Sequence, residues 1–349
     1  MKRYSEKEAL EVLQHFPLKT LGKMANEVRK SLHPQDITTF IIDRNINYTN
    51  ICWVDCKFCA FKRRVNEEGT YILSFEEIDA KIDELIEIGG TQILFQGGVH
   101  PKLKIEWYED LVSHIHKKYP KITIHGFSAI EINYIAKISQ IPISEVLMRL
   151  QSAGLSSIPG AGAEILSDRV RDVIAPKKLS VNEWLEVHRE AHKIGMKTTA
   201  TMMFGSVEKD EDIIEHLTHI RNLQDEYGGF RAFIAWSFQP KYTPLHHEFP
   251  HLFSASSNRY LRILATSRLF LDNVKNIQSS WVTQGRHIGQ LALLFGANDL
   301  GSVMMEENVV SSAGVSHRMN TQEMIALIKD LGFIPAKRNT AYEILEEYV

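Results

Sequence analysis

DITTFIIDRNINYTNICWVDCKFC, residues 36–59, joins a dense run of apolar and β-branched residues to three closely spaced cysteines. Residues of these types favour extended backbone, so the run predicts a buried β-strand. The cysteines then lie on the loop that follows this strand. They are Cys52, Cys56 and Cys59, in the spacing C-x3-C-x2-C, and the chain of 349 residues has no others.

Alternating strand and helix patterns follow the cysteine loop. Ser74 and Glu77 form a capping box that predicts a helix start, and Gly89-Gly90 ends that helix. A second capping box, at Ser180 and Glu183, opens a later helix. The apolar run TQILF predicts a strand, KITIH predicts the next one, and the alternation gives about eight strands, the last at NDLGS. This order is typical of an α/β fold with a parallel sheet.

We therefore predict a TIM-type (β/α)8 barrel, closed or partly open, over residues 37–318. Residues 1–36 predict an N-terminal helical extension, and residues 319–349 predict a C-terminal helical extension packed on the barrel. No internal repeat, low-complexity tract or Pro/Gly-rich linker divides the chain further.

The charge balance argues against two classes of partner. With 40 Lys and Arg against 43 Asp and Glu, the formal net charge is −3, which gives no basic field for nucleic acid or anionic lipid. The apolar runs are far shorter than the ~20 residues of a membrane helix, and the first residues lack a secretory signal pattern. We expect a cytoplasmic protein that binds neither nucleic acid nor membranes.

Three thiolates at this spacing suit iron and sulfur. Four-iron clusters normally take four cysteines, so three would leave one iron open to a ligand such as S-adenosylmethionine (SAM), through its amino and carboxylate groups. Other interpretations remain open: a zinc site in a non-catalytic binding protein, a Cys56–Cys59 redox pair, or cysteines packed as small hydrophobic residues. A zinc site would need a fourth ligand brought in by folding.

The pattern C-x3-C-x-aromatic-C, with Phe58 as the aromatic residue, resembles the signature of the radical SAM superfamily. The resemblance implies a 4Fe-4S cluster on the three cysteines and SAM as the second cofactor. It also implies reductive cleavage of SAM to methionine and a 5′-deoxyadenosyl radical. A low-potential electron donor such as flavodoxin or ferredoxin would then be a partner.

Two further motifs carry roles that the resemblance implies. Gly97 and Gly98, in QGG, match the glycines that lie beside the SAM amino group, although no acid follows them directly in this chain. Glu164, in IPGAGAEIL, resembles a polar contact to the SAM ribose or to the substrate. The structural alternatives are a tight turn for the glycines and a favourable acid in a first helical turn for Glu164.

Longer stretches narrow the resemblance to the family of cyclic dehypoxanthinyl futalosine synthases, in the futalosine route to menaquinone. These stretches are TNICWVDCKFCAFKRR, QGGVHPKLKIEWYEDL, LSSIPGAGAEILSDRVR and WVTQGRHIGQLALLFGANDLGSVMMEENVVSSAG. The family implies dehypoxanthine futalosine as a small-molecule substrate, hydrogen abstraction at C4′, and attack of that carbon on the benzoate ring. Aminofutalosine synthase and deazaflavin synthase-like enzymes are the alternatives within the superfamily.

Candidate catalytic residues follow from the barrel, since active sites lie at the carboxyl ends of its strands. His125 and Asp299 each place a titratable group at a predicted strand end, and either could accept the ring proton. His188 and His192 lie four residues apart on a helix, and we interpret them as part of a solvated face. Further candidates are Ser128 and Gln239 at strand ends, and Arg231, Lys241 and Arg286 for the benzoate carboxylate.

Overall fold

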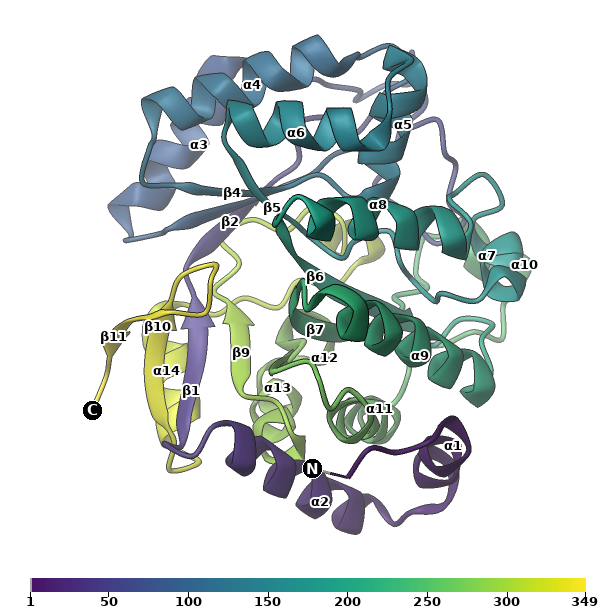
Figure 1. Cartoon of the computed structure of the whole chain (residues 1–349), viewed down its shortest axis with the longest axis vertical. Helices are drawn as coiled ribbons and strands as arrows, with labels where there is room; N and C mark the ends of the chain where they lie inside the picture. The colour runs from purple at the N-terminus through teal and green to yellow at the C-terminus, as the bar shows by residue number, and fades with distance from the viewer. Residues whose placement is uncertain (1) are drawn as a thin grey trace.

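The computed structural model describes residues 2–349, which form a curled sheet with helices packed around its outer side (Figure 1). The strands are β1 (Ile37–Ile41), β2 (Asp43–Ile46), β3 (Gln92–Phe95), β4 (Thr123–Gly126), β5 (Leu155–Ile158), β6 (Lys197–Phe204), β7 (Phe230–Ser237), β8 (Asn276–Gln278), β9 (Asp299–Ser302), β10 (Ile334–Arg338) and β11 (Ile344–Glu347).

The helices alternate with these strands along most of the chain. The α-helices are α1 (Glu6–His15), α2 (Leu18–Leu32), α3 (Phe75–Glu87), α4 (Ile105–Lys118), α5 (Ala129–Ser139), α6 (Ile143–Ala153), α7 (Asp168–Ile174), α8 (Val181–Lys193), α9 (Asp210–Tyr227), α10 (Pro244–Glu248), α11 (Ser257–Phe270), α12 (Trp281–Gln284), α13 (Arg286–Ala292) and α14 (Thr321–Lys329). Both predicted capping boxes are present, at the starts of α3 and α8.

The sheet confirms the predicted α/β barrel in a partly open form. Its strand order is β11-β10-β1-β9-β8-β7-β6-β5-β4-β3-β2. Within residues 2–349 every ladder is parallel except that between β10 and β11. Parallel strands need helical crossovers, so the helices cover the outer face and the strands become buried on both sides.

The first predicted strand is divided at Ile42. Its first half, β1, pairs with β9 and β10, whereas its second half, β2, pairs with β3 at the other end of the sheet. This segment therefore joins the two ends of the curled sheet without a continuous ladder between them. The carboxyl ends of β2 to β9 consequently surround a common space, and the cysteine loop leaves from the end of β2.

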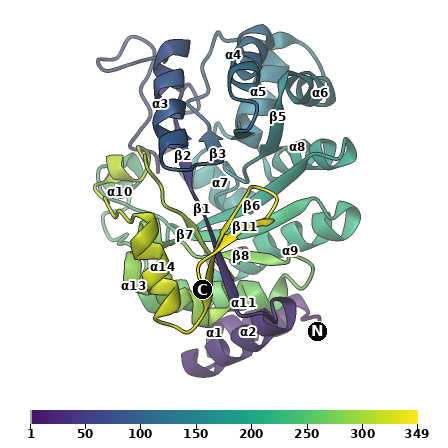
Figure 2. The ribbon, with the colours of Figure 1, turned by 90° about the vertical axis from the view of Figure 1, so that its left-hand side faces the viewer.

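The N-terminal helical extension is present as α1 and α2. Helix α2 packs on α11 and α1 on α9, and both views show these helices beside α11 (Figure 1, Figure 2). Amphipathic spacing explains the contact, because Val12, Leu21 and Ala25 are buried against Ala265 and Leu269.

The C-terminal segment differs from the helical extension that the sequence predicts. Helix α14 is followed by two strands, and β10 lies beside β1 as an extension of the sheet (Figure 1). IPAKR and ILEE contain few β-branched residues, so pairing with β1 determines their conformation rather than intrinsic preference. The division of the chain at residues 36/37 and 318/319 stays a prediction.

None of the helices among residues 2–349 is both long enough and apolar enough to span a membrane.

The interpretation of His188 and His192 as part of a solvated face is wrong. Both histidines are buried on α8, where His188 lies 3.9 Å from Trp184 and His192 lies 4.9 Å from Phe230, measured between ring centroids. The Nε2 atom of His192 is 2.8 Å from the hydroxyl of Thr198. Their face of the helix packs on the sheet, and burial lowers the pKa of His192 to about 4 and that of His188 well below its usual value.

Buried neutral histidines make stability depend on pH. The pKa of His192 is lower in the folded chain, about 4, than in the unfolded chain, so its contribution is complete above the unfolded value of about 6.5. That contribution is lost as pH falls toward 4. As pH falls from about 7 to about 5, protonation of His192 should cost the wild-type protein on the order of 2 kcal/mol of unfolding free energy. We expect His192→Gln not to show this loss. Urea unfolding at the two pH values measures this difference.

The matched control is His15→Gln, because the side chain of His15 is 63% exposed. It should reproduce the pH dependence of the wild-type protein. An unchanged pH dependence in His192→Gln would show that protonation of His192 does not contribute.

Candidate active site

A cavity of about 410 Å³ lies inside the barrel, at the carboxyl ends of the strands. Most residues that the sequence nominates line this cavity. They come from the loop after β2, the ends of β3 and β4, and the loop after β5, and they are Cys52, Cys56, Cys59, Gly97, Gly98, His125, Ser128 and Glu164. The described lining residues do not include Asp299, Arg231, Gln239, Lys241 or Arg286.

The cysteine loop is held by backbone hydrogen bonds to distant segments. The amide of Cys52 donates to the carbonyl of Arg63 at 2.9 Å, and the amide of Lys57 donates to Ile174, at the end of α7, at 2.9 Å. The carbonyl of Lys57 accepts from Leu245 in α10 at 2.8 Å. Two helices that are far apart in sequence therefore fix the loop in place.

Asp55 stabilises the same loop through ion pairs with residues of the loop itself. Its φ of 61° is in the left-handed region, and its carboxylate is paired with Lys62 and, at 2.9 Å, with Arg64. The hydrogen bond from Lys62 holds the pKa of Asp55 below its usual value. The residue between the first two cysteines thus ties them to the basic segment that follows the third.

The three thiols differ in exposure but face one cavity. Cys56 is buried, whereas Cys52 and Cys59 are partly exposed. Burial raises the pKa of Cys56 to about 12 and also raises that of Cys59, so binding of a metal centre must displace protons. Within residues 2–349, no three His, Cys, Asp or Glu side chains converge on one ion position. The three cysteines line one cavity, and thiolates are the usual ligands of a four-iron cluster, so the chemistry of this set suits such a cluster.

The two glycines pack against the segment that leads to the cysteines. A Cβ on Gly98 would lie 2.3 Å from the carbonyl oxygen of Ile51, and one on Gly97 would lie 2.9 Å from the ring of Tyr48. Both approaches are too short for a side chain, so glycine is required here by packing. The predicted contact of these residues with SAM stays a prediction.

A buried acid that the sequence analysis missed lies beside the glycines. The Glu131 carboxylate accepts hydrogen bonds from the Tyr48 hydroxyl at 2.5 Å and the Gly97 amide at 3.0 Å. It also accepts from the amide and the hydroxyl of Ser128, at 2.7 and 2.5 Å, and burial raises its pKa. The capping-box spacing of Ser128 and Glu131 could have found it. Glu131 links the ends of β2, β3 and β4.

Glu164 is buried at the cavity in a strained backbone conformation, with φ of 43°. One carboxylate oxygen, Oε1, is 2.5 Å from the ammonium nitrogen of Lys178. The other, Oε2, is buried without a hydrogen-bond partner among residues 2–349. Lys178 also lines the cavity, and no pattern in the sequence had singled it out.

Backbone strain is concentrated at this end of the barrel. Five non-glycine residues in the loops that follow strands have φ between 43° and 63°. Such conformations cost free energy and are common where a site needs a fixed geometry. The residues are Asp55 after β2, Phe127 after β4, Glu164 after β5, Tyr242 after β7 and Met304 after β9.

His125 is placed on β4 with its ring facing the cavity. Its Nδ1 atom lies 2.7 Å from the hydroxyl of Ser157. Burial, followed by the charges of Arg231 and Arg338, lowers the pKa of His125 to about 3, so the ring is neutral near neutral pH. A neutral imidazole here can donate or accept one hydrogen bond toward a ligand.

Asp299 is fully engaged in structural contacts. Its carboxylate forms a bidentate pair with Arg338, through Nε at 2.5 Å and Nη2 at 3.0 Å. It also accepts from the Thr39 hydroxyl at 2.5 Å and the Gly301 amide at 2.9 Å. Asp299 as the proton acceptor stays a prediction, and these contacts give it no support.

Asp43 is a second acid that the sequence analysis missed. It is buried on β2, lines the cavity, and accepts hydrogen bonds from Gln92 at 2.7 Å and from the Ser302 hydroxyl. Burial raises the pKa of Asp43 to about 6. An acid directly after the apolar run Phe40-Ile41-Ile42, within the predicted strand, was the available signal.

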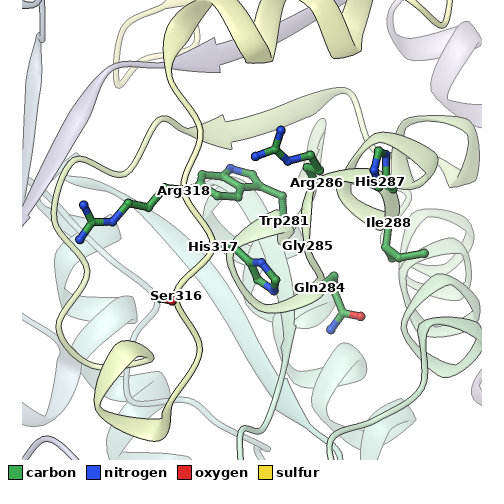
Figure 3. Close-up of a pocket in the computed structure, with 9 residues that line it drawn as sticks. All are labelled: Trp281, Gln284, Gly285, Arg286, His287, Ile288, Ser316, His317 and Arg318. Atoms are coloured by element: carbon green, nitrogen blue, oxygen red, sulfur yellow. The ribbon is translucent and has the colours of Figure 1, made fainter.

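A second pocket, of about 430 Å³, opens beside α12 and α13 (Figure 3). Trp281 lines both this pocket and the barrel cavity. Its basic residues include Arg286, which is paired with Glu323 at 3.1 Å, and the ring of His317, which lies near Gly285 (Figure 3). Since its lining contains none of the three cysteines, we place the active site in the barrel cavity.

Two family descriptions together match most of the chain. Residues 46–220 match the radical SAM superfamily, and residues 227–348 match the CofH/MqnC C-terminal region. The first range contains the cysteine loop, the glycines and Glu164. The second contains β10, with Arg338.

Curated relatives are similar over nearly the whole chain. A cyclic dehypoxanthine futalosine synthase of Halalkalibacterium halodurans is 43% identical, covering 99% of this chain and 92% of the relative. Another from Streptomyces coelicolor is 45% identical, covering 98% and 86%. A 5-amino-6-(D-ribitylamino)uracil–L-tyrosine 4-hydroxyphenyl transferase of Methanocaldococcus jannaschii is 39% identical, covering 99% and 98%.

Solved structures are similar in fold. The FeFe-hydrogenase maturase HydG of Carboxydothermus hydrogenoformans has a TM-score of 0.76 at 17% identity, covering 98% of this chain and 78% of that one. Methylornithine synthase (PylB) has a TM-score of 0.74 at 17% identity, covering 96% and 95%.

Proposed function

Because this chain belongs to the radical SAM superfamily, whose enzymes use a 4Fe-4S cluster and SAM, we propose that it is a cyclase of the futalosine route to menaquinone. Its substrate is dehypoxanthine futalosine and its product is cyclic dehypoxanthinyl futalosine. The observation that carries the proposal is the 43% and 45% identity to two cyclic dehypoxanthine futalosine synthases over nearly the full chain.

The residues that would hold the two cofactors lie together. Cys52, Cys56 and Cys59 would bind the cluster, and Gly97, Gly98 and Glu164 would face SAM. When bound, these groups supply a hydrogen-abstracting organic radical. The electron comes from a low-potential donor such as flavodoxin or ferredoxin.

The cavity residues position the substrate and exclude water. Apolar side chains, including Val54, Phe58 and Ile130, line the cavity and keep other hydrogen donors away from a reactive carbon. Asp43 and Gln92, linked by a hydrogen bond, offer polar groups to the sugar hydroxyls. Holding sugar and ring in contact favours closure of the new carbon–carbon bond.

After the new bond forms, the ring must lose one electron, to the cluster or to an external acceptor, and one proton, to a base, to become aromatic again. His125 and Asp299 are the candidates from the sequence, and we infer that a side chain lining the cavity, His125 or Asp43, is better placed than Asp299. Asp43 is the stronger base of the two, since its pKa is about 6 and that of His125 is about 3.

The pH profile of turnover tests Asp43. As a base, Asp43 must be ionised, so cyclisation should decrease as pH falls through about 6. We expect Asp43→Asn to remove this acidic limb and to lower turnover by about 100-fold or more, the usual contribution of a positioned base. His125→Gln is the comparison, and it should keep the acidic limb. If Asp43→Asn kept the wild-type limb, Asp43 would not be the titrating base.

A second candidate function is supported by the 39% identity to the archaeal 4-hydroxyphenyl transferase. Parallel incubations separate the two candidates. One contains dehypoxanthine futalosine, and the other contains 5-amino-6-(D-ribitylamino)uracil with L-tyrosine. A product two hydrogen atoms lighter than dehypoxanthine futalosine supports the cyclase, whereas a product that joins two substrates supports the transferase.

A further inference from the structure

Lys178 is a lysine buried inside the barrel cavity. Its side chain is only 7% exposed, and its ammonium nitrogen lies 2.5 Å from Glu164 Oε1. The same nitrogen lies 5.1 Å from the ring centre of Phe58, which separates Cys56 from Cys59. Lysine is rarely buried, because desolvation of its charge is expensive. A buried pair at this place needs a reason other than stability.

The surrounding contacts hold this pair against the cysteine loop. Arg171 donates to the carbonyls of Gly162, at 3.3 Å, and of Ala163, at 2.5 Å, so the backbone before Glu164 is fixed. The charge of Lys178 lies close enough to Cys56 for a Coulombic interaction. Together with the contact to Phe58, this places the cation beside the segment that holds Cys56 and Cys59.

The second carboxylate oxygen of Glu164 is placed to accept a hydrogen bond from a ligand. Glu164 is 6% exposed, and its Oε2 has no hydrogen-bond partner within the described residues. Buried acceptors are almost always paired in folded proteins. The residue also lies in a strained backbone conformation at the cavity. An unpaired buried oxygen in such a place fits a bound group that donates a hydrogen bond.

We propose that Lys178 is a positioning residue for both cofactors: it fixes Glu164 so that Oε2 receives a donor group of SAM, and its ammonium stabilises the reduced cluster beside Cys56. The inference rests on the proposed binding of the cluster and SAM in this cavity, and it is independent of which substrate is converted. A cation next to a cluster favours the added electron, so the reduction potential depends on Lys178.

The test uses Lys178→Met and Lys178→Arg in the reconstituted full-length protein, with Lys177→Met as the matched control. Lys177 is the preceding residue, is 55% exposed, and lies 3.8 Å from Asp55 of the cysteine loop. Lys177→Met therefore removes the same charge near the same loop, but from the surface of the protein. Two readouts are needed: the dissociation constant for SAM, and the cluster midpoint potential from an EPR-monitored redox titration.

For Lys178→Met we expect the dissociation constant for SAM to rise by about tenfold or more, because Glu164 loses its partner. The midpoint potential should shift to a more negative value, and Lys178→Arg should restore much of both effects. Lys177→Met should match wild type. If Lys178→Met matched Lys177→Met in both readouts, the inference would be overturned.

Failure to assemble the cluster is also informative. If Lys178→Met holds no iron while Lys178→Arg does, the need for a cation at this position is upheld. If neither variant holds iron while apo-protein folding is unchanged, the geometry of the lysine rather than its charge matters, and the electrostatic part of the inference is overturned. A wild-type protein that binds cluster and SAM but does not cyclise the substrate would contradict the proposed function alone.

Discussion

Replacing Cys56 with alanine is expected to abolish both the cluster and turnover. Cys56 is buried, and the chain has three cysteines in total, so no spare thiol can take its place. In Cys56→Ala, only Cys52 and Cys59 would remain as protein ligands of the cluster. Iron and sulfide per chain, measured after anaerobic reconstitution, should fall to background, and 5′-deoxyadenosine should no longer form from SAM.

Val54→Ala is the matched control for Cys56→Ala. Val54 is 2% exposed, lines the same cavity and belongs to the same loop. Its truncation removes apolar volume but leaves all three thiols, so the cluster should still assemble. Full iron content in Cys56→Ala would contradict the assignment of the cysteines. Complete loss of iron in Val54→Ala would show that packing of the loop, and not the thiol, decides assembly.

Arg338→Met is expected to destabilise the fold by about 3–5 kcal/mol, because it leaves the Asp299 carboxylate buried without its cation. The two side chains are 4% and 0% exposed, and two hydrogen bonds join them. The guanidinium also lies 3.9 Å from the ring of Tyr342. Urea unfolding of the apo protein measures the cost.

Two variants make this prediction specific. The double variant Arg338→Met/Asp299→Leu should recover most of the loss, since replacing both members of a buried pair by apolar residues is often close to neutral. Lys337→Met, the neighbouring residue on β10, loses an ion pair to Glu346 at 3.6 Å and should cost less than about 1 kcal/mol. A cost below about 1 kcal/mol for Arg338→Met would mean that the pair does not hold β10 to β9.

Local patterns in the sequence predict much of this fold. Apolar runs identify β3, β4, β6 and β7, and capping boxes locate the starts of α3 and α8, because both features depend on residues close in sequence. The cysteine loop is predictable for the same reason. Its spacing and its position after the first strand bring the three cysteines to the barrel end.

Apart from the local contact of Glu131 with Ser128, the main interactions that were missed form only when the chain folds. Arg338 reaches Asp299 across 39 residues, and β10 becomes a strand through pairing with β1. Lys178 meets Glu164 only after the chain passes through α7. His192 is a further example. Polar residues on a helix suggest a solvent-exposed face, and only the packing of that helix on the sheet shows that His192 is buried. These positions depend on tertiary contacts that spacing does not encode.

The most direct test of the central claim is anaerobic incubation of the reconstituted full-length protein with SAM, a low-potential reductant and dehypoxanthine futalosine. Liquid chromatography with mass spectrometry follows 5′-deoxyadenosine and the futalosine product together. We predict that both form, with a product whose mass and fragmentation show the sugar carbon joined to the benzoate ring. Formation of 5′-deoxyadenosine without a cyclised product would contradict the substrate, and the absence of both from protein that holds a full cluster would contradict the proposed reaction.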